Sequence, residues 1–274
     1  MTAPLPGRLV LLGHPVSHSL SPAFQNAALR AAGIPLAYEA LDVPPDALSG
    51  VLQLLLAQRA AGNVTIPHKD AVYRACAARS ELAERAGAVN TFWVDATGRL
   101  VGDNTDVHGI EALADALGVE RASARVALLG SGGSASAVCA AIERWPGAQV
   151  RVFARTASRS AALAARFPAL VRLAGSASDA LSGATLVINA TPVGMRDDAL
   201  PLGLAALPRD ARVMDLVYRP GETRWVREAR AAGHAALDGI EMLLHQGARS
   251  FERWFARAAD LAVMRDALQR AARP

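Results

Sequence analysis

One residue draws attention by its type. The chain contains a single lysine, Lys69, whereas its other 28 basic residues are arginines. Arginine stays protonated in proteins because its pKa lies above about 12, but a lysine can release and recover a proton. Lys69 is therefore a candidate for a position that needs a titratable amine. Chance survival of one lysine in an arginine-rich chain explains the count equally well, so both interpretations stay open at this point.

A glycine-rich loop provides a second chemical signal. An apolar run at 125–129 leads directly into GSGGSA at 130–135, and a helical pattern follows. In such a strand–loop–helix unit the first glycine allows a tight turn, the second lets the backbone approach a pyrophosphate, and the small third residue allows close packing. Helix N-terminal amides then face the phosphates. The pattern predicts a dinucleotide site at Gly130, Gly132, Gly133, Ser134 and Ala135, with a mere tight turn as the alternative.

The end of the next expected strand indicates which dinucleotide would bind. NAD sites usually carry Asp or Glu there, to hold the ribose hydroxyls. Here the strand at 150–154 runs into Arg155 and Thr156, with Arg159 one turn later and no acidic residue at the strand end. Guanidinium groups bind phosphate through paired hydrogen bonds. We therefore expect NADP rather than NAD, with ordinary surface charge as the alternative interpretation of both arginines.

The elements that must position these residues alternate between strands and helices. Short apolar or β-branched runs predict strands at 9–12, 38–43, 63–66, 89–94, 100–102, 125–129, 150–154, 185–189, 212–216 and 235–237. Apolar residues at helical spacing predict helices at 22–32, 46–59, 80–86, 107–117, 135–144, 158–166, 224–232, 242–255 and 260–271. A Thr97-Gly98 turn suggests that 89–94 and 100–102 form a hairpin. The remaining alternation is typical of parallel strands joined by right-handed crossovers.

The chain length and the spacing of the expected strands and helices together predict two α/β domains. A chain of 274 residues suits one large or two modest domains, and the repeating units become longer after Asp106. We expect a first domain at 1–104, completed by the C-terminal helices at 238–274. Residues 105–237 are expected to form a Rossmann-type, doubly wound nucleotide-binding domain.

Composition excludes several other classes of protein. Hydrophobic residues make up 52% of the chain, which is enough for a packed core, but no apolar stretch approaches the roughly 18–20 residues that span a bilayer. The N-terminal MTAPLPGR lacks a signal-peptide pattern, and two cysteines are too few for a disulfide framework, so a cytoplasmic location is expected. The formal charge of +4 is scattered, which argues against nucleic-acid binding. No residues have convincing metal-site spacing, so no metal is expected.

Several ordered motifs make the chain resemble the shikimate dehydrogenases across essentially its whole length. They are GHPVSHSLSP at 13–22, GNVTIPHK at 62–69, GAVNT at 87–91, GDNTD at 102–106, the glycine loop with ART at 154–156, NATPVG at 189–194, DLVYRP at 215–220 and GIEMLLHQ at 239–246. The resemblance implies that the first domain binds substrate. It also implies reversible reduction of 3-dehydroshikimate to shikimate with NADPH, a step in aromatic amino-acid biosynthesis.

The resemblance further implies a role for each matching residue. Lys69 and Asp106 would form a catalytic pair in which Lys69 either exchanges a proton or binds the reacting oxygen. Ser19 and Ser21, which alternate along an expected extended segment, would bind the substrate carboxylate near Tyr218. The side chains expected to bind ring hydroxyls are Asn63, Thr65, Asn90 and Gln246. Besides the glycine loop, Arg155, Thr156 and Arg159, the cofactor residues would be Asn189, Thr191, Gly239 and Met242.

Three departures from the family pattern keep alternatives open. Gln25 stands where the family usually has His, Ala154 where it usually has Asn, and Pro192 where Ser is common. Loss of the Asn side chain near the adenosine end would weaken the selectivity for NADP. A quinate/shikimate paralogue with relaxed use of NAD and NADP is therefore the first alternative, and a nucleotide-binding homologue without turnover is the second. A monomer and a homodimer fit the sequence equally well.

Overall fold

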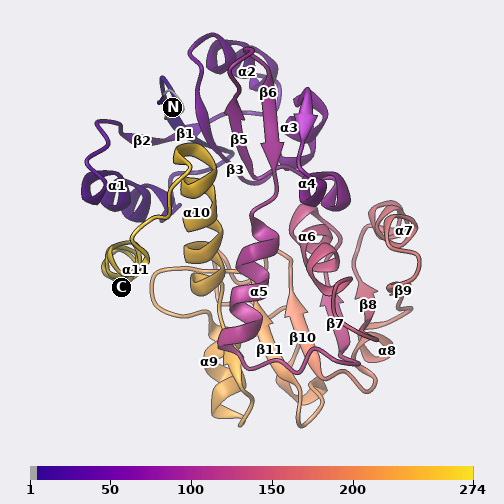
Figure 1. The fold of residues 1–274 in the computed structure, drawn as a ribbon. Coiled ribbons are helices and arrows are strands. Elements are labelled where there is room, and N and C mark those ends of the chain that lie inside the picture. Colours follow the sequence, from indigo (N-terminus) through magenta and orange to yellow (C-terminus); the bar gives the residue numbers. More distant parts are fainter. Residues whose placement is uncertain (1–4, 274) are drawn as a thin grey trace. The chain divides into compact units, whose positions relative to one another are not determined.

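The computed structural model describes residues 5–273, which divide into two compact units (Figure 1). Unit 1 combines the chain up to Asp106 with Leu243–Arg273, and unit 2 comprises Val107–Met242. Both boundaries lie slightly later in the chain than the sequence pattern suggested, because the helices at these points begin in one unit and continue in the other. The C-terminal helices belong mainly to unit 1.

Unit 1 contains a mixed six-stranded sheet. Its strands are β1 (Leu9–Gly13), β2 (Tyr38–Asp42), β3 (Ala61–Val64), β4 (Ala78–Arg79), β5 (Thr91–Val94) and β6 (Leu100–Asp103), in the order β2-β1-β3-β5-β6-β4. β1 pairs in parallel with β2 and β3, whereas β5 is antiparallel to β3 and β6. The β5–β6 pair confirms the predicted hairpin.

This strand order collects several chain segments at one edge of the sheet. β1, β3 and β6 all end at this edge, and the antiparallel β5 begins there. In the register, Thr91 lies opposite Asn63 on one side and opposite Asp103 on the other. The segments that follow β1, β3 and β6, and the residue that precedes β5, are therefore brought together by backbone pairing alone.

Helices cover the sheet of unit 1. They are α1 (Ser21–Ala31), α2 (Leu48–Ala57), α3 (Lys69–Ala75), α4 (Glu81–Ala86), most of α10 (Ile240–Phe255) and α11 (Leu261–Ala271). Val10, Leu55, Val72 and Phe92 belong to one buried core cluster. α1 packs against α11 (Figure 1). α10 approaches α1 so closely that a Cβ on its Gly247 would lie 2.4 Å from a ring carbon of Phe24.

Unit 2 contains a parallel, doubly wound sheet. Its strands are β7 (Arg125–Leu129), β8 (Gln149–Phe153), β9 (Val171–Leu173), β10 (Leu186–Asn189), β11 (Arg212–Asp215) and β12 (Ala236–Leu237), in the order β12-β11-β10-β7-β8-β9. The chain adds strands outward from β7 to β9 and then crosses over to continue from β10 to β12. The order therefore reverses between β7 and β10, where such sheets bind ligands. This topology confirms the predicted Rossmann-type class.

The helices of unit 2 connect these strands. They are most of α5 (Asp106–Ala116), α6 (Gly133–Ile142), α7 (Ala157–Arg166), α8 (Ala177–Leu181), α9 (Arg224–Ala231) and a short 3-10 helix, η1 (Leu204–Ala206). α6 is almost entirely buried, consists mainly of small residues and includes the free cysteine Cys139. Such small side chains let a helix pack closely against its strand, as the third position of a glycine loop requires.

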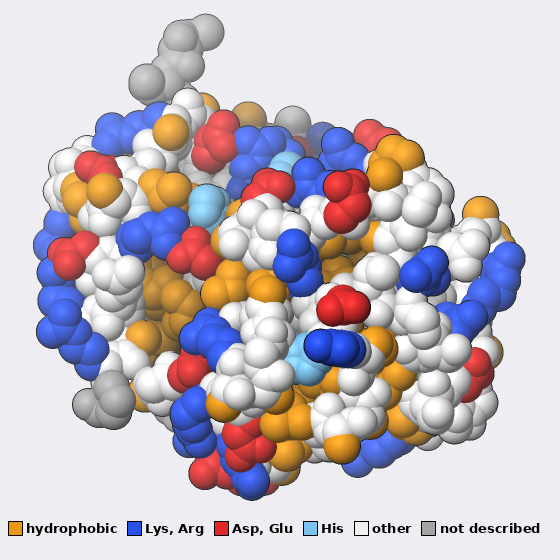
Figure 2. All heavy atoms as spheres, turned by 90° about the horizontal axis from the view of Figure 1, so that it is seen from below, with side chains coloured by type: hydrophobic (Ala, Val, Ile, Leu, Met, Phe, Trp, Pro, Cys, Tyr) orange, Lys and Arg blue, Asp and Glu red, His pale blue; other side chains and the backbone are white. Residues whose placement is uncertain are grey.

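The surface carries both signs of charge. On the face shown in Figure 2, Lys and Arg side chains are interspersed with Asp and Glu. Ion pairs of this kind include Arg74–Asp70 and Arg270–Asp266, each one helical turn apart. Among residues 5–273, no helix is long and apolar enough to cross a membrane.

Candidate functional site

The chain's only lysine forms an ion pair with Asp106. Lys69 Nζ lies 2.5 Å from Asp106 Oδ2, and the two side chains are only 13% and 6% exposed. Lys69 opens α3 just after β3, and Asp106 opens α5 just after β6. A carboxylate is favoured at a helix N-terminus by the helix dipole. The structure therefore brings together the two residues expected to form the catalytic pair.

Neighbouring groups fix the backbone around Lys69. The Lys69 carbonyl accepts a hydrogen bond from the Val89 amide at 3.0 Å. The ring of His68, which is buried, is 2.6 Å from the Val43 carbonyl through Nε2. The segment after β3 is thus held both to the chain before β5 and to the chain after β2. His68 acts structurally here, because its ring contact is with a backbone group.

Asn90 holds the other oxygen of Asp106. Its Nδ2 donates to Asp106 Oδ1 at 2.8 Å, while its Oδ1 accepts from the Thr105 amide at 2.7 Å. A backbone N–H can only donate and a carboxylate can only accept, so these two contacts define which way the amide of Asn90 points. Asn90 Nδ2 also reaches Gln246 Oε1 at 3.3 Å. Asn90 and Gln246 therefore meet at the Lys69–Asp106 pair, as expected for site residues.

Asn63 is nearby but is engaged with protein groups. Its Nδ2 contacts the Asn90 carbonyl at 3.1 Å, Thr91 Oγ1 at 3.0 Å and Ser250 Oγ at 2.8 Å. Its Oδ1 accepts from the Tyr38 hydroxyl at 2.8 Å. Both amide hydrogens of Asn63 are thus directed at protein acceptors, which favours a supporting role beside any contact with a ligand.

The serine motif differs from its expected conformation. Ser21 is the first residue of α1, with Pro22 next to it, so the two serines do not alternate along an extended strand. Proline favours the first turn of a helix, which explains why the helix begins there. The Ser21 amide donates to Ser19 Oγ at 3.2 Å. The two hydroxyls are therefore placed by a loop and a helix start, with Ser21 buried and Ser19 half-buried.

Thr65 lies beside the beginning of the same motif. A Cβ on Gly13 would lie 2.5 Å from Thr65 Cγ2, so glycine allows this close approach. The Thr65 amide donates to the Leu12 carbonyl, and the His14 amide donates to the Ile66 carbonyl. The loops after β1 and β3 therefore run together. Tyr218 lies half-buried in the loop after β11 of unit 2.

The glycine loop occupies the switch point of unit 2. Gly130 has a φ of +108°, which an L side chain rarely adopts, and a Cβ there would lie 3.0 Å from the Ala190 carbonyl oxygen. The Gly130 amide donates to the Phe153 carbonyl, so the loop joins the ends of β7 and β8. α6 begins at Gly133 rather than at Ala135, which places Gly133, Ser134 and Ala135 in its first turn. The first amides of a helix lack intrahelical partners and can face phosphate.

The arginines expected to select NADP are available for binding. Arg155, Thr156 and Arg159 are all exposed at the end of β8 and the start of α7. Within the described part of the chain, neither guanidinium takes part in an ion pair or hydrogen bond. Two free guanidiniums close to a glycine loop form a suitable site for a phosphate group.

Asn189 and Thr191 shape the opposite side of the switch point. Asn189 is buried, and its Oδ1 accepts from the Thr191 amide at 3.0 Å and from Thr191 Oγ1 at 2.7 Å. Further along the chain, Gly239 allows a close approach, because a Cβ there would lie 2.5 Å from the Leu216 carbonyl oxygen. Met242 is buried in α10. Of these four residues, Asn189 and Thr191 form hydrogen bonds with each other and so stabilise the loop after β10.

Asp215 anchors the loop that carries Tyr218. Its Oδ1 accepts from Asn189 Nδ2 at 2.8 Å and from the Val217 amide at 3.1 Å, and its Oδ2 accepts from Thr223 Oγ1 at 2.9 Å. Burial raises the pKa of the Asp215 carboxyl from 3.8 to about 6 despite these bonds, and nearby Asp238 adds to the rise. Burial also raises the pKa of Asp238 to about 6. Sequence reasoning placed Asp215 in a motif but assigned no role to it.

Two residues of α10 were missed by sequence reasoning. Ser250 contacts Thr91 and Thr105, and Arg253 pairs with the buried Asp103. The helical spacing could have identified both residues, because positions four and seven residues after Gln246 lie on the same face of a helix. No group of His, Cys, Asp or Glu suited to holding a metal ion occurs among residues 5–273.

Comparisons with known proteins agree with these motifs. Residues 11–92 match the shikimate dehydrogenase substrate binding domain, and residues 239–269 match the shikimate 5'-dehydrogenase C-terminal domain. The shikimate dehydrogenase (NADP(+)) of Symbiobacterium thermophilum is 41% identical over 276 residues, covering 96% of this chain and 94% of that protein.

Solved structures show the same fold. The shikimate 5-dehydrogenase of Thermus thermophilus, in complex with NADP(H) and shikimate, has a TM-score of 0.86 at 39% identity and covers 96% of this chain and 99% of its own. A quinate dehydrogenase from Corynebacterium glutamicum in complex with NAD has a TM-score of 0.83 at 31% identity, with coverages of 94% and 97%. Identity at this level over nearly all of both chains shows that the protein belongs to the shikimate dehydrogenase family.

Proposed function

We propose that this chain is an NADP-dependent shikimate dehydrogenase that reversibly reduces 3-dehydroshikimate to shikimate. The observation that carries the proposal is the ion pair between Lys69 and Asp106 at one sheet edge, in a chain that also has a doubly wound nucleotide unit. Relatives that cover nearly the whole chain carry the name of this activity.

The polar groups assigned to the site in unit 1 suit a small hydroxylated acid. Asn90, Gln246 and Thr65 offer both donors and acceptors, which ring hydroxyls require. Ser19 and Ser21 offer hydroxyls for a carboxylate at the start of α1. We assign these residues of unit 1 to substrate binding, with Asn63 supporting Asn90. The role of Tyr218 near the carboxylate stays a prediction from the family resemblance.

The residues of unit 2 fit NADP. Gly130 keeps the switch point open to a pyrophosphate, and the first amides of α6 are available to it. Arg155 and Arg159 provide free guanidiniums for the 2′-phosphate, with Thr156 between them. We assign Asn189, Thr191, Gly239 and Met242 to the walls of this site. When bound, NADPH supplies the hydride that reduces the substrate carbonyl.

Lys69 performs the proton transfer in this proposal. Its ammonium donates a proton to the carbonyl oxygen as negative charge develops there, which leaves a neutral amine on Lys69. In the oxidative direction, the amine takes the hydroxyl proton back. Asp106 holds Nζ through Oδ2, and Asn90 holds Asp106 through Oδ1, so the amine is fixed in place before the substrate arrives.

A second candidate is a quinate/shikimate dehydrogenase with relaxed use of NAD and NADP. Ala154 favours it, because this small residue at the end of β8 removes a polar side chain from the expected adenosine end. The similar fold of a quinate dehydrogenase in complex with NAD also supports it. Cytoplasmic location and the choice between monomer and homodimer stay predictions from the sequence.

A direct assay tests the proposal. The purified protein is incubated with shikimate and NADP⁺, and separately with quinate and NAD⁺, while the absorbance of reduced nicotinamide is followed. We expect a higher kcat/KM with shikimate and NADP⁺. Comparable or higher values with quinate and NAD⁺ would favour the second candidate, and turnover of neither pair would favour a binding protein without catalysis.

A further inference from the structure

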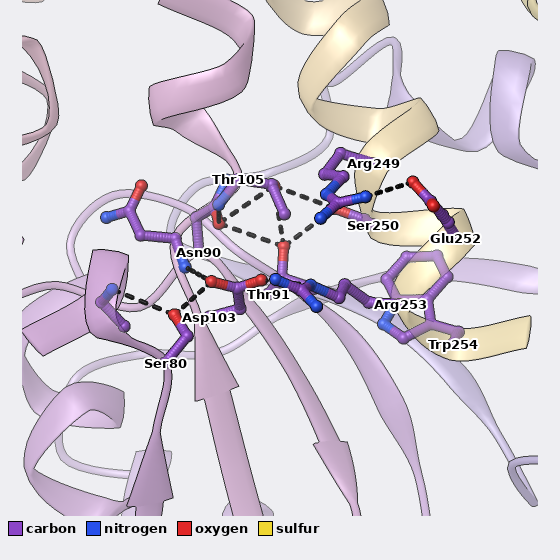
Figure 3. Close-up of polar contacts among 12 residues, drawn as sticks. Ser80, Asn90, Thr91, Asp103, Thr105, Arg249, Ser250, Glu252, Arg253 and Trp254 are labelled. Atoms are coloured by element: carbon purple, nitrogen blue, oxygen red, sulfur yellow. Dashed lines mark hydrogen bonds and ion pairs between the residues drawn. The ribbon is translucent and has the colours of Figure 1, made fainter. Parts of the chain in front are cut away.

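Three buried hydroxyl groups meet where α10 faces the edge of the sheet in unit 1. Ser250 Oγ lies 2.8 Å from Thr91 Oγ1 and 3.1 Å from Thr105 Oγ1, and the two threonine oxygens are 2.9 Å apart. All three residues are completely buried. Figure 3 shows Ser250 reaching from α10 toward the two threonines. We call these three residues the hydroxyl triangle.

Two members of the hydroxyl triangle, Thr91 and Thr105, contact the carbonyl end of Asn90, and Thr105 Oγ1 also accepts from Asn90 Nδ2 at 3.0 Å. Asn90 Oδ1 lies 3.0 Å from Thr91 Oγ1 and 3.1 Å from Thr105 Oγ1, in addition to its bond from the Thr105 amide. The opposite end of the same amide donates to Asp106, which binds Lys69. Any rotation of the Asn90 amide would therefore change the hydrogen bond to Asp106.

Ser250 directs the protons of the hydroxyl triangle. Each hydroxyl has one proton, and the Ser250 hydroxyl is 2.9 Å from the Gln246 carbonyl, which can only accept. With its proton committed there, Ser250 Oγ accepts from Asn63 Nδ2 at 2.8 Å and from one threonine. The other threonine can then donate to Asn90 Oδ1, which lies within hydrogen-bond distance of both threonine hydroxyls. Without Ser250 Oγ, both threonines and the Asn63 amide compete for fewer acceptors.

We propose that Ser250 is a positioning residue for the reaction: through the hydroxyl triangle it reinforces the orientation of Asn90 that the Thr105 amide and Asp106 define, and Asn90 in turn holds Asp106 and Lys69. The inference rests on the proposed function, since it concerns the residues assigned to proton transfer. It assigns a catalytic contribution to α10 beyond that of Gln246. Ser250 itself is completely buried, and its hydroxyl is within hydrogen-bond distance of Asn63, the two threonines and the Gln246 carbonyl.

A double-mutant cycle tests whether Ser250 acts through Asn90. We expect Ser250→Ala to lower kcat roughly 5- to 50-fold, because small misplacements of reacting groups reduce rates by up to about 100-fold. The KM for NADP⁺ should stay within about twofold of the wild-type value. In an Asn90→Ala background, the same substitution should change kcat by less than about twofold, since the residue it orients is gone. Equal fold-changes in both backgrounds would overturn the proposal.

A control variant separates positioning from stability. Trp254 lies on the same helix, α10, and donates from Nε1 to the Phe92 carbonyl at 3.2 Å. Trp254→Phe removes this buried hydrogen bond and should lower the melting temperature while leaving kcat within about twofold. If Trp254→Phe lowers kcat as much as Ser250→Ala does, the effect is general to the helix and the proposal fails.

A crystal structure of Ser250→Ala provides a readout that does not depend on activity. We expect Asn90 Nδ2 to move away from its 2.8 Å contact with Asp106 Oδ1. An unchanged contact would overturn the inference even if the wild-type protein turns over shikimate. If the amide moves as expected but the wild type is inactive with shikimate, the positioning inference stands and the proposed function fails.

Discussion

Arg253 Nε lies 2.5 Å from Asp103 Oδ2, whose carboxylate has no exposed surface. Asp103 ends β6, and its Oδ1 also contacts the Ser80 hydroxyl (Figure 3). The Asn104 amide donates to the same oxygen. The ion pair therefore joins the C-terminal α10 to the segment that leads into Asp106. A buried carboxylate needs such partners, because an unpaired buried charge is strongly unfavourable.

Arg253→Met should destabilise unit 1 because it leaves Asp103 without its counter-charge. Removal of one partner from a fully buried pair costs about 3–5 kcal/mol, and partial exposure of Arg253 reduces our expectation to about 2 kcal/mol. Urea unfolding monitored by circular dichroism measures the change. The matched control is Arg270→Met in α11, where both partners of the Arg270–Asp266 pair are more than half exposed. Equal stability losses in the two variants would contradict this account.

Replacement of Lys69 separates its two possible roles. Lys69→Met should lower kcat about 10²–10⁴-fold if the amine transfers a proton. Lys69→Arg keeps the positive charge but cannot release a proton at ordinary pH, so it should restore little activity. Substantial recovery in Lys69→Arg would instead indicate that the charge only binds the reacting oxygen. Arg74→Met in the same helix is the control, because that exposed side chain pairs with Asp70 outside the site.

Arg155 should determine the preference between NADP and NAD. Arg155→Ala removes a free guanidinium at the end of β8 and should raise the KM for NADP⁺ about 10- to 100-fold, as expected for a lost hydrogen bond to a charged group. The KM for NAD⁺ should change little, because NAD⁺ lacks the 2′-phosphate. Arg209→Ala, which removes another exposed arginine of unit 2, is the control. A parallel loss of affinity for both cofactors would rule out selective phosphate binding.

Unit 2 was largely predictable because its signals are local. The strand at Arg125–Leu129 was predicted with its observed bounds, since an apolar run ends at a glycine loop there. The doubly wound order then follows from alternating strands and helices. β9 and α8 were missed, because three- and five-residue elements carry too few residues for a periodic pattern.

Unit 1 was less predictable where tertiary contacts decide the structure. The seven-residue α3, which Lys69 opens, was missed, because no helix was predicted between 66 and 80. Ser21 was expected in an extended segment although Pro22 favours a helix start. The contacts of Ser250 and Arg253 link residues about 150 positions apart. Such contacts depend on how α10 packs against the sheet, which no local pattern specifies.

The pKa of Asp215 predicts an unusual pH dependence of stability. Burial raises this pKa from 3.8 to about 6, so the folded protein retains a proton that the unfolded chain has already released between these pH values. The contribution of Asp215 to stability is therefore fully present below pH 3.8 and is lost as the pH rises through about 6. Asp215→Asn retains an acceptor for Asn189 and Val217, so it should remove this loss without disrupting the loop.

Melting temperatures of wild type and Asp215→Asn from pH 4 to 7 provide the measurement. As the pH rises from 4 to 7, the variant should gain about 2–3 kcal/mol of stability relative to wild type. This figure follows because one pKa unit corresponds to about 1.36 kcal/mol. Asp95→Asn provides a control, because hydrogen bonds from Arg99 and Thr97 hold the pKa of Asp95 well below its ordinary value. The contribution of Asp95 to stability is fully present above its ordinary pKa of 3.8 and is lost only at lower pH, so the stability difference between wild type and Asp95→Asn should change little from pH 4 to 7. If the difference between wild type and Asp215→Asn does not change over this pH range, Asp215 is not held protonated by burial.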